Sequence, residues 1–437
     1  MNPAKPPALS AGLRKMAVIG PAAFLNSMGI GSVNLGLIFI LREVFHAPPA
    51  MVGRFGALWS LVYFASCLVF RNLTARLVPR NSMTFMTAAS AVIILSLCAV
   101  PSLPAAFIAY SAFGAVLAFF WPPLMGWLSR GLEGRDLSRA TGLFSFSWSL
   151  GGIVSPYLAG TLSERGKFLP LWFAVAMFTA NAVFLQVSKR FLRDSDERPA
   201  PSLARSASVR DESTPLRFSA WTSVFVLYAA VGILANIFPL FARAELGLSE
   251  SRTGLLITVR TAATTAGFLF FGRSSFWRFR KGLLPVPTSL AAGAALILAL
   301  AAGVLPVLAA GLVIFGFAAA WAYNSSMFYG ASGASDRDRR MTVHEALLTV
   351  GQVFGSLLGG ILYQASSMRA VFLFTAFLAG AGVWTQSWMA RRRFGETPAQ
   401  RPPLGMDGRL FPGPSAENGD PDSTEKSDEL PGHGSAG

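Results

Sequence analysis

The sequence predicts an all-α polytopic membrane protein, with twelve transmembrane helices in two six-helix bundles that repeat in parallel. Of its 437 residues, 53% are hydrophobic and only 14% are charged, whereas average soluble domains carry about 25% charged residues. Ten apolar runs are long enough to cross a bilayer, and two of these are long enough to cross it twice. Short sequence patterns also recur at an offset of about 200 residues, which indicates a duplicated unit.

The predicted spans follow from the apolar runs. The first, 16–41, contains no charge and no cleavage site follows it, so it is a retained span and not a signal peptide. The charge-free runs 81–129 and 282–335 are each divided by a proline-containing turn, PSLP at 101–104 and GVLP at 303–306. The remaining predicted spans are 50–70, 140–163, 168–188, 218–242, 253–272, 341–366 and 370–390.

The basic residues predict the orientation. The net charge of +15 does not indicate a nucleic-acid partner, because Lys and Arg lie in short segments between apolar runs. With the N-terminus placed in the cytoplasm, the inner segments hold 29 of the 37 basic residues. We therefore expect a multi-pass protein of the plasma (inner) membrane with both termini cytoplasmic. Cys67 and Cys98 lie inside apolar runs, so they indicate neither a disulfide framework nor a metal site.

Five segments follow from these spans. We expect a cytoplasmic N-tail at 1–15, an N-terminal six-helix bundle at 16–188 and a cytoplasmic linker rich in Pro, Ser and Arg at 189–217. A C-terminal six-helix bundle at 218–393 precedes a Pro/Gly-rich tail at 394–437, which we expect to be disordered and cytoplasmic.

Two local stretches carry the repeat. GGIVSPYLAG (151–160) matches GQVFGSLLGG (351–360) at an offset of 200, and FGAVLAFFW (113–121) matches FGFAAAWAY (315–323) at 202. Two further pairs lie 201 residues apart, Arg80 with Lys281 and Gly53 with Gly254. Parallel repeats of this kind enclose a site near the bilayer midplane and work by rocking against each other.

With these features the chain resembles the major facilitator superfamily over roughly residues 14–393. The resemblance rests on the six-plus-six topology, the inner linker, the basic loop RNLTARLVPR (71–80) and the glycine–proline motif GGIVSPYLAG of the fifth span. It implies secondary transport by alternating access, with spans 1, 4, 7 and 10 lining the pathway. Ala75 stands where the family's loop has an aspartate, while Arg76 and Arg80 keep its basic pattern and are candidates for an inner-loop gate.

Arg260 is the most deeply embedded charge. It lies about 12 Å from the outer end of its span, and intramembrane charges are costly enough to be functional by default. A guanidinium binds carboxylate or phosphate at two points, so we interpret Arg260 as a contact for a substrate anion. A structural ion pair or a cap on helix carbonyls is the alternative.

Glu345 lies about one turn inside its span and begins a polar stripe with Thr349, Gln352 and Ser356, spaced for one helix face. Such a stripe must face other helices or water, which makes Glu345 a candidate for proton coupling. The alternative is a carboxylate held by Arg337 or Arg339 in the loop. At the repeat offset its counterpart is Ser145, and that of Arg260 is Trp59, so both charges belong to the second half alone.

His344 shares a helix face with three glycines. We expect that face to pack against another helix, because small residues let backbones approach, and we keep His344 as a second proton-coupling candidate. The residues expected in close packing or conformational change are Gly151, Pro156, Gly160, Gly351, Gly355 and Gly359. The further candidates for substrate binding, each of which is equally compatible with an interhelical contact, are Asn26, Asn34, Asn236, Trp121, Tyr323, Asn324 and Gln352.

The leading functional interpretation is a secondary transporter of a small organic solute, anionic or drug-like, with protons as the coupling ion and a preference for export. We expect a monomer. A non-transporting sensor or membrane assembly partner of the same fold is the alternative. No P-loop lysine motif, Asp-rich diphosphate motif or Cys/His metal spacing occurs, so the sequence indicates no enzyme, no cofactor and no metal.

Overall fold

A computed structural model describes residues 11–129, 134–190, 213–334 and 336–393, and all regular structure within them is helical. Most of the predicted linker and the predicted disordered tail lie outside the described residues. The first half of the chain contributes α1 (Ala11–Glu43), α2 (Pro49–Val69), α3 (Arg71–Arg76), α4 (Pro79–Ala99), α5 (Leu103–Leu117), α6 (Trp121–Ser129), α7 (Gly134–Arg165) and α8 (Leu169–Val187). The second half contributes α9 (Leu216–Asn236), α10 (Phe238–Ala244), α11 (Glu250–Arg273), α12 (Val286–Ala301), α13 (Leu305–Ala331), α14 (Arg337–Ala365) and α15 (Met368–Arg393).

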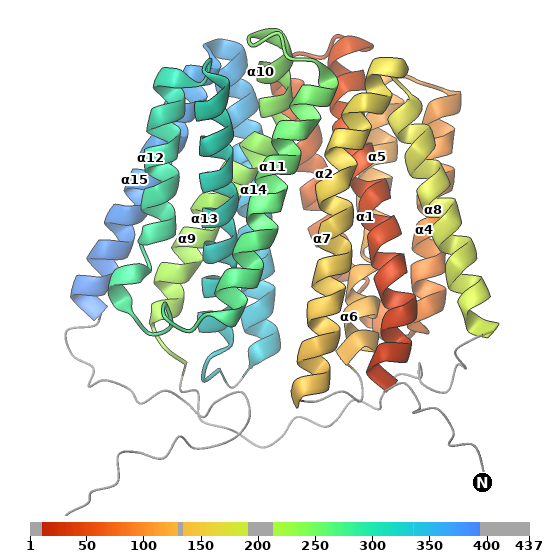
Figure 1. The fold of residues 1–437 in the computed structure, drawn as a ribbon, viewed down its shortest axis with the longest axis horizontal. Coiled ribbons are helices and arrows are strands. Elements are labelled where there is room, and N and C mark those ends of the chain that lie inside the picture. Colours follow the sequence, from red (N-terminus) through yellow and green to blue (C-terminus); the bar gives the residue numbers. More distant parts are fainter. Residues whose placement is uncertain (1–10, 130–133, 191–212, 335, 394–437) are drawn as a thin grey trace, which may run out of the picture. The chain divides into compact units, whose positions relative to one another are not determined.

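These helices confirm the predicted spans to within a few residues. Eleven helical segments of the described part are long and apolar enough to cross a membrane. The remaining predicted span, the fifth at 140–163, corresponds to α7, which packs along α1 and α11 (Figure 1). Serines and glycines are frequent along α7.

Prolines divide the fourth span into α5 and α6. Because Pro123 has no N–H, it cannot donate to the carbonyl of Phe119 four residues earlier. The hydroxyl of Ser82 on α4 donates to that carbonyl instead, at 2.8 Å. The chain between the two helices turns through tighter bonds, such as Phe120 N–H to Leu117 O at 3.1 Å. The fourth span is therefore interrupted between Leu117 and Trp121, and the carbonyl of Phe119 that the interruption releases still accepts a hydrogen bond.

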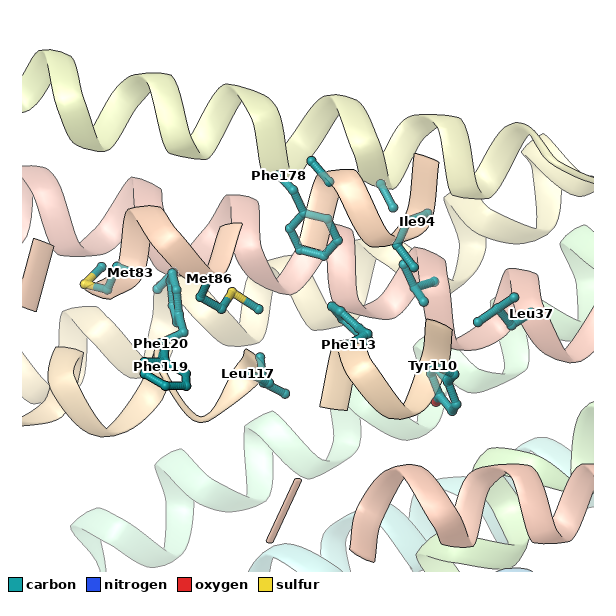
Figure 2. Packing of buried hydrophobic residues seen from close by; sticks show 14 of the residues in the cluster. Leu37, Met83, Met86, Ile94, Tyr110, Phe113, Leu117, Phe119, Phe120 and Phe178 are labelled. Carbon is teal, nitrogen blue, oxygen red and sulfur yellow. The ribbon is translucent and has the colours of Figure 1, made fainter. Parts of the chain in front are cut away.

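The core of the first half is rich in aromatic and sulfur-containing side chains. Figure 2 shows Phe113 of α5 facing Phe178 of α8, and their ring centroids are 5.7 Å apart. Met83 and Met86 of α4 pack beside Phe119 and Phe120 in the same cluster. This packing holds α1, α4, α5 and α8 together and leaves α2 and α7 to meet the second half.

The helices run between two ends. We call the end at which α1 begins and α15 ends the termini end, which is the lower end in Figure 1. The other we call the ion-pair end, after the charges described below.

The two halves meet through two helix pairs, α7 with α11 and α2 with α14. In the first pair, a Cβ added to Gly254 would lie 2.2 Å from the carbonyl oxygen of Pro156, and one added to Gly160 would lie 2.3 Å from that of Glu250. The hydroxyl of Thr258 also donates to the carbonyl of Ile153 across this pair, at 2.8 Å. Only glycine permits so close an approach of two backbones.

The second pair repeats this arrangement. A Cβ on Gly53 would lie 2.3 Å from the carbonyl oxygen of Ser356, and one on Gly360 would lie 2.7 Å from that of Pro49. Gly53 and Gly254 are thus equivalent by the sequence offset and also by their place between the halves. Both close contacts lie towards the ion-pair end, because α2 and α11 begin there and α7 and α14 end there.

Candidate functional site

Five polar side chains from five helices form what we call the polar cluster: Tyr63 of α2, Tyr228 of α9, Arg260 of α11, Tyr323 of α13 and Glu345 of α14. Glu345 interacts electrostatically with all three tyrosines, and Arg260 interacts with Tyr228. The rings of Tyr228 and Tyr323 are 6.3 Å apart. Tyr63 comes from the first half and the other four from the second, so the cluster lies between the halves.

Arg260 lies near the middle of α11. Its side chain is partly exposed, while its Nε is buried and has no hydrogen-bond partner among the described residues. No carboxylate of the described ranges forms a salt bridge with it. The helix around it is continuous from Glu250 to Arg273. Neither the ion pair nor the carbonyl cap considered from the sequence is therefore present in the described part of the chain.

Glu345 is exposed and forms no salt bridge within the described ranges, either with Arg260 or with Arg339. The side chain of Arg337 is not among those described. The predicted polar stripe divides along α14, because Thr349 and Ser356 are buried while Gln352 is partly exposed. Gln352 makes no side-chain hydrogen bond within the described residues.

His344 packs against α13. Its Nδ1 shares a 2.7 Å hydrogen bond with the hydroxyl of Ser326, and its ring lies edge-on to Tyr323 at 4.8 Å. The side chain is only 1% exposed. His344 is therefore placed to hold Tyr323 in the polar cluster.

The glycines predicted to pack with His344 lie against a different helix. A Cβ on Gly355 would meet the carbonyl oxygen of Ala229 on α9 at 1.9 Å, and one on Gly351 would meet that of Phe225 at 2.6 Å. Gly359 faces Ile233 of α9. In the first half, Gly151 lies similarly close to the carbonyl oxygen of Phe24 on α1.

Aromatic rings extend the polar cluster towards both halves. Phe268 of α11 lies 5.2 Å from Tyr323 and 6.5 Å from Trp148 of α7. On α2, Trp59 stacks on Tyr63 at 5.9 Å. The site therefore combines one guanidinium and one carboxylate with aromatic surface.

Three of the asparagines considered from the sequence make hydrogen bonds within the bundles. Asn34 accepts from the Tyr110 hydroxyl at 2.9 Å, and Asn324 donates to the Ala320 carbonyl one turn away at 2.9 Å. Asn236 donates to the Ser356 hydroxyl at 2.9 Å. These side chains connect helices or helix turns and lie outside the polar cluster as we define it.

Two further candidates lie in the first half. Asn26 is fully buried, and neither polar atom of its amide has a partner among the described residues. Trp121 contacts Phe120 and Phe144 edge-on. The polar cluster thus contains two of the substrate-binding candidates predicted from the sequence, Arg260 and Tyr323. It also contains one of the proton-coupling candidates, Glu345.

The two arginines considered for an inner-loop gate lie at the termini end. Arg76 is exposed. Arg80 is fully buried, and its guanidinium packs over the Trp127 ring at 5.3 Å. Arg80 thus packs inside the first half, between α4 and α6.

An ion network crosses between the halves at the ion-pair end. Lys167, between α7 and α8, pairs with Glu43 of α1 and with Glu250 of α11. Arg243 of α10 binds Glu43 through its Nε at 3.0 Å and lies 3.9 Å from Glu250. The Glu250 side chain is only 2% exposed. Burial alone would lower the pKa of Lys167, but the two carboxylates raise it above its ordinary value.

A second contact joins the same helices. The carboxylate of Glu164 on α7 accepts from the backbone N–H of Ser251 at 2.9 Å and from its hydroxyl at 2.7 Å. This carboxylate therefore caps the first turn of α11, where unpaired N–H groups favour negative charge.

The ion network was not predicted from the sequence, although a signal for it was present. Glu43 and Arg243 are 200 residues apart, so opposite charges occupy equivalent positions of the two repeats. Tyr63 and Tyr228 were also missed, because an isolated tyrosine in an apolar run carries no periodic signal.

Residues 19–223 and 220–412 match the family profile described as Major Facilitator Superfamily. The chain is 24% identical over 289 residues to Multidrug resistance protein 2 of Bacillus subtilis (strain 168), covering 64% of this chain and 71% of that protein. Multidrug resistance protein 1 of the same organism is 22% identical over 290 residues, with 63% and 71% covered.

Solved structures share the fold at low sequence identity. A POT family transporter in complex with 5-aminolevulinic acid is similar with a TM-score of 0.69 and 12% identity, covering 87% of this chain and 96% of that one. A bacterial homolog of the human lysosomal transporter Spinster, in an inward-facing and unoccupied conformation, has a TM-score of 0.67 and 13% identity, with 86% and 97% covered.

Proposed function

Because the chain belongs to the Major Facilitator Superfamily and is a secondary transporter of a small molecule, we propose that it exports an organic solute with an aromatic or apolar body and an anionic group. The observation that carries this proposal is Arg260, an unpaired guanidinium among the described residues at the junction of the halves. In a membrane protein such a charge requires a counter-charge, and a carboxylate or phosphate of the substrate supplies one in two-point geometry.

The aromatic residues support the apolar part of the substrate. Tyr63, Tyr228 and Tyr323 contribute aromatic rings to the cluster itself, and Phe268 packs against Tyr323 beside it. Binding sites for small organic molecules are mostly apolar and contain a few placed polar groups that fix orientation. The similarity to two multidrug resistance proteins supports the direction of transport as export.

The ion network is the proposed outer gate. It joins α1 and the α7–α8 turn of one half to α10 and α11 of the other, at the end where the glycine contacts also lie. The halves in this structure are therefore held together at one end, and rocking towards the other state requires these pairs to separate. Their electrostatic free energy contributes to the balance between the two states.

We place the ion-pair end outside and both termini in the cytoplasm of the cell membrane, and we expect the chain to work as a monomer. The distribution of basic residues supports the orientation. Each half already finds its partner within one chain through α2–α14 and α7–α11, which supports a monomeric unit.

The test uses matched pairs of aromatic carboxylates and their neutral methyl esters. We expect the acids to show counterflow in proteoliposomes containing the protein, and the esters to be carried at least tenfold less well because they cannot pair with Arg260. Equal transport of both members of every pair would contradict the anionic substrate. Binding of the acids without counterflow would instead favour a non-transporting sensor.

Proton coupling is assigned to Glu345. We expect Glu345→Gln to abolish transport driven by a pH gradient while leaving substrate counterflow intact, since the amide cannot carry a proton but keeps the shape of the side chain. The measurement compares the two assays in the same proteoliposomes, with Glu245→Gln at the opposite end as the matched control. Retained pH-gradient drive in the Glu345 variant would exclude its role as the coupling group.

A further inference from the structure

The loop between α11 and α12 lies at the termini end, at the lower end of the helices in Figure 1, and concentrates positive charge. Arg273, Arg278, Arg280 and Lys281 fall within nine residues, and the sequence from 251 to 335 contains no Asp or Glu at all. Within the described ranges, Arg273, Arg278 and Arg280 form no salt bridge. The loop therefore presents cations without acidic neighbours in its own segment.

The loop is held in one shape by hydrogen bonds to α11 and α13. Phe279 has a φ of +57°, which is uncommon for a bulky residue and costs conformational free energy. Its N–H donates to the Tyr329 hydroxyl at 2.7 Å, and that hydroxyl donates to the Trp277 carbonyl at 3.2 Å. Trp277 in turn donates from Nε1 to the Phe271 carbonyl at 3.1 Å. A strained turn maintained by three bonds is the kind of feature that positions a binding group.

Arg278 is the group that this shape positions. Its guanidinium packs over the rings of Phe328, at 5.1 Å, and Trp277, at 5.8 Å. The Nε is buried without a hydrogen-bond partner among the described residues, and the side chain as a whole is partly exposed. Stacking fixes the plane of a guanidinium and so reduces the entropy lost when it binds an oxyanion.

Exposed apolar side chains lie close to these cations in the sequence, at the same end of α11. Leu269, Phe270 and Phe276 are each 40% exposed or more, and α11 ends at Arg273 while α12 begins only at Val286. Such a surface belongs to the hydrocarbon boundary, where aromatic rings accumulate at the level of the headgroups. The acyl chains of a lipid would thus contact the exposed apolar side chains near the end of α11, and its charged headgroup would contact the cations beside them.

We propose that the α11–α12 loop binds the phosphate of an anionic phospholipid headgroup, with Arg278 and Arg280 as the main contacts. Each cation near an anionic leaflet contributes about 1 kcal/mol of attraction. A loop whose charges serve only to set topology would need neither the strained turn at Phe279 nor the stacked guanidinium. The leaflet that supplies the lipid depends on the orientation proposed above. Binding of the lipid to the loop does not depend on that orientation.

The experiment measures binding of phosphatidylglycerol to the purified full-length protein by native mass spectrometry and by thermal shift, with phosphatidylcholine as the neutral lipid. We expect selective retention of phosphatidylglycerol and a higher Tm in its presence. The double variant Arg278→Gln/Arg280→Gln should bind it about 25-fold more weakly, and Arg280→Gln, which leaves the stacked residue in place, about fivefold more weakly.

The matched control is Arg54→Gln/Arg252→Gln, which removes two exposed arginines at the ion-pair end and should bind phosphatidylglycerol as the wild type does. Equal weakening by the control, or no weakening by either loop variant, would overturn the proposal. Stabilisation by soluble glycerol phosphate equal to that by phosphatidylglycerol would also overturn it, because the ligand would then not be a lipid. All these readouts are independent of transport, so the proposed function is tested separately.

Discussion

Arg260→Ala is expected to lower kcat/KM for an anionic substrate by about 10- to 100-fold, because hydrogen bonds to a charged group are worth about 1.5–3 kcal/mol. The folded yield should stay unchanged, since Arg260 forms no salt bridge within the described residues. Removing an unpaired guanidinium from between the halves removes a charge that is costly without substrate. The cost of the substitution should therefore appear in transport and not in stability.

Transport in proteoliposomes, together with Tm in detergent, measures this effect. Arg252→Ala is the matched control, since this exposed arginine lies two turns earlier on the same helix. Arg260→Lys keeps the charge but loses the two-point geometry, so an intermediate rate is expected. Anion transport by Arg260→Ala at the wild-type rate would rule out the proposed anion site.

Lys167→Ala is expected to shift the protein towards the state that is open at the ion-pair end. Without Lys167, Glu250 loses a partner while almost fully buried, and Glu43 and Glu250 then face each other with Arg243 alone between them. Breaking a buried pair is strongly destabilising, but Lys167 and Arg243 are each about a third exposed, so solvent screens part of the effect. We expect about 1–2 kcal/mol, or a 5- to 30-fold change in the ratio of the two states.

Spin labels at positions 165 and 252 report this change as a distance distribution. Both residues are exposed and belong to different halves, on α7 and α11, and the labels are introduced after Cys67 and Cys98 have been replaced. A longer distance should gain population in Lys167→Ala but not in the control Lys189→Ala at the termini end. An unchanged distribution in Lys167→Ala would exclude the network as a gate.

The gate should persist at alkaline pH. The pKa of Lys167 is raised by its carboxylate partners, so its contribution is fully present below the ordinary pKa of lysine. That contribution is lost only as the pH rises through the raised value. The short label distance should accordingly remain dominant throughout the physiological range.

Residues of the second half show where inference from the sequence works and where it stops. Arg260 and Glu345 are identifiable from the sequence because a charge in an apolar run is costly wherever the helix packs. Their partners are not identifiable in this way. Successive residues differ by about 100° around a helix, so small differences in helix rotation decide whether Ser356 faces a substrate or, as observed, the amide of Asn236.

The class of protein, the spans, the duplicated unit and the glycines that approach neighbouring backbones could all be predicted from the amino-acid sequence. These depend on chain-local quantities: the length of an apolar run, the missing N–H of a proline and the missing side chain of a glycine. The proximity of Tyr63 to Glu345, and the meeting of Glu43, Lys167, Arg243 and Glu250 at one end, became evident from the folded structure alone. Contacts between residues far apart in the chain depend on how whole helices pack, and no local pattern specifies that packing.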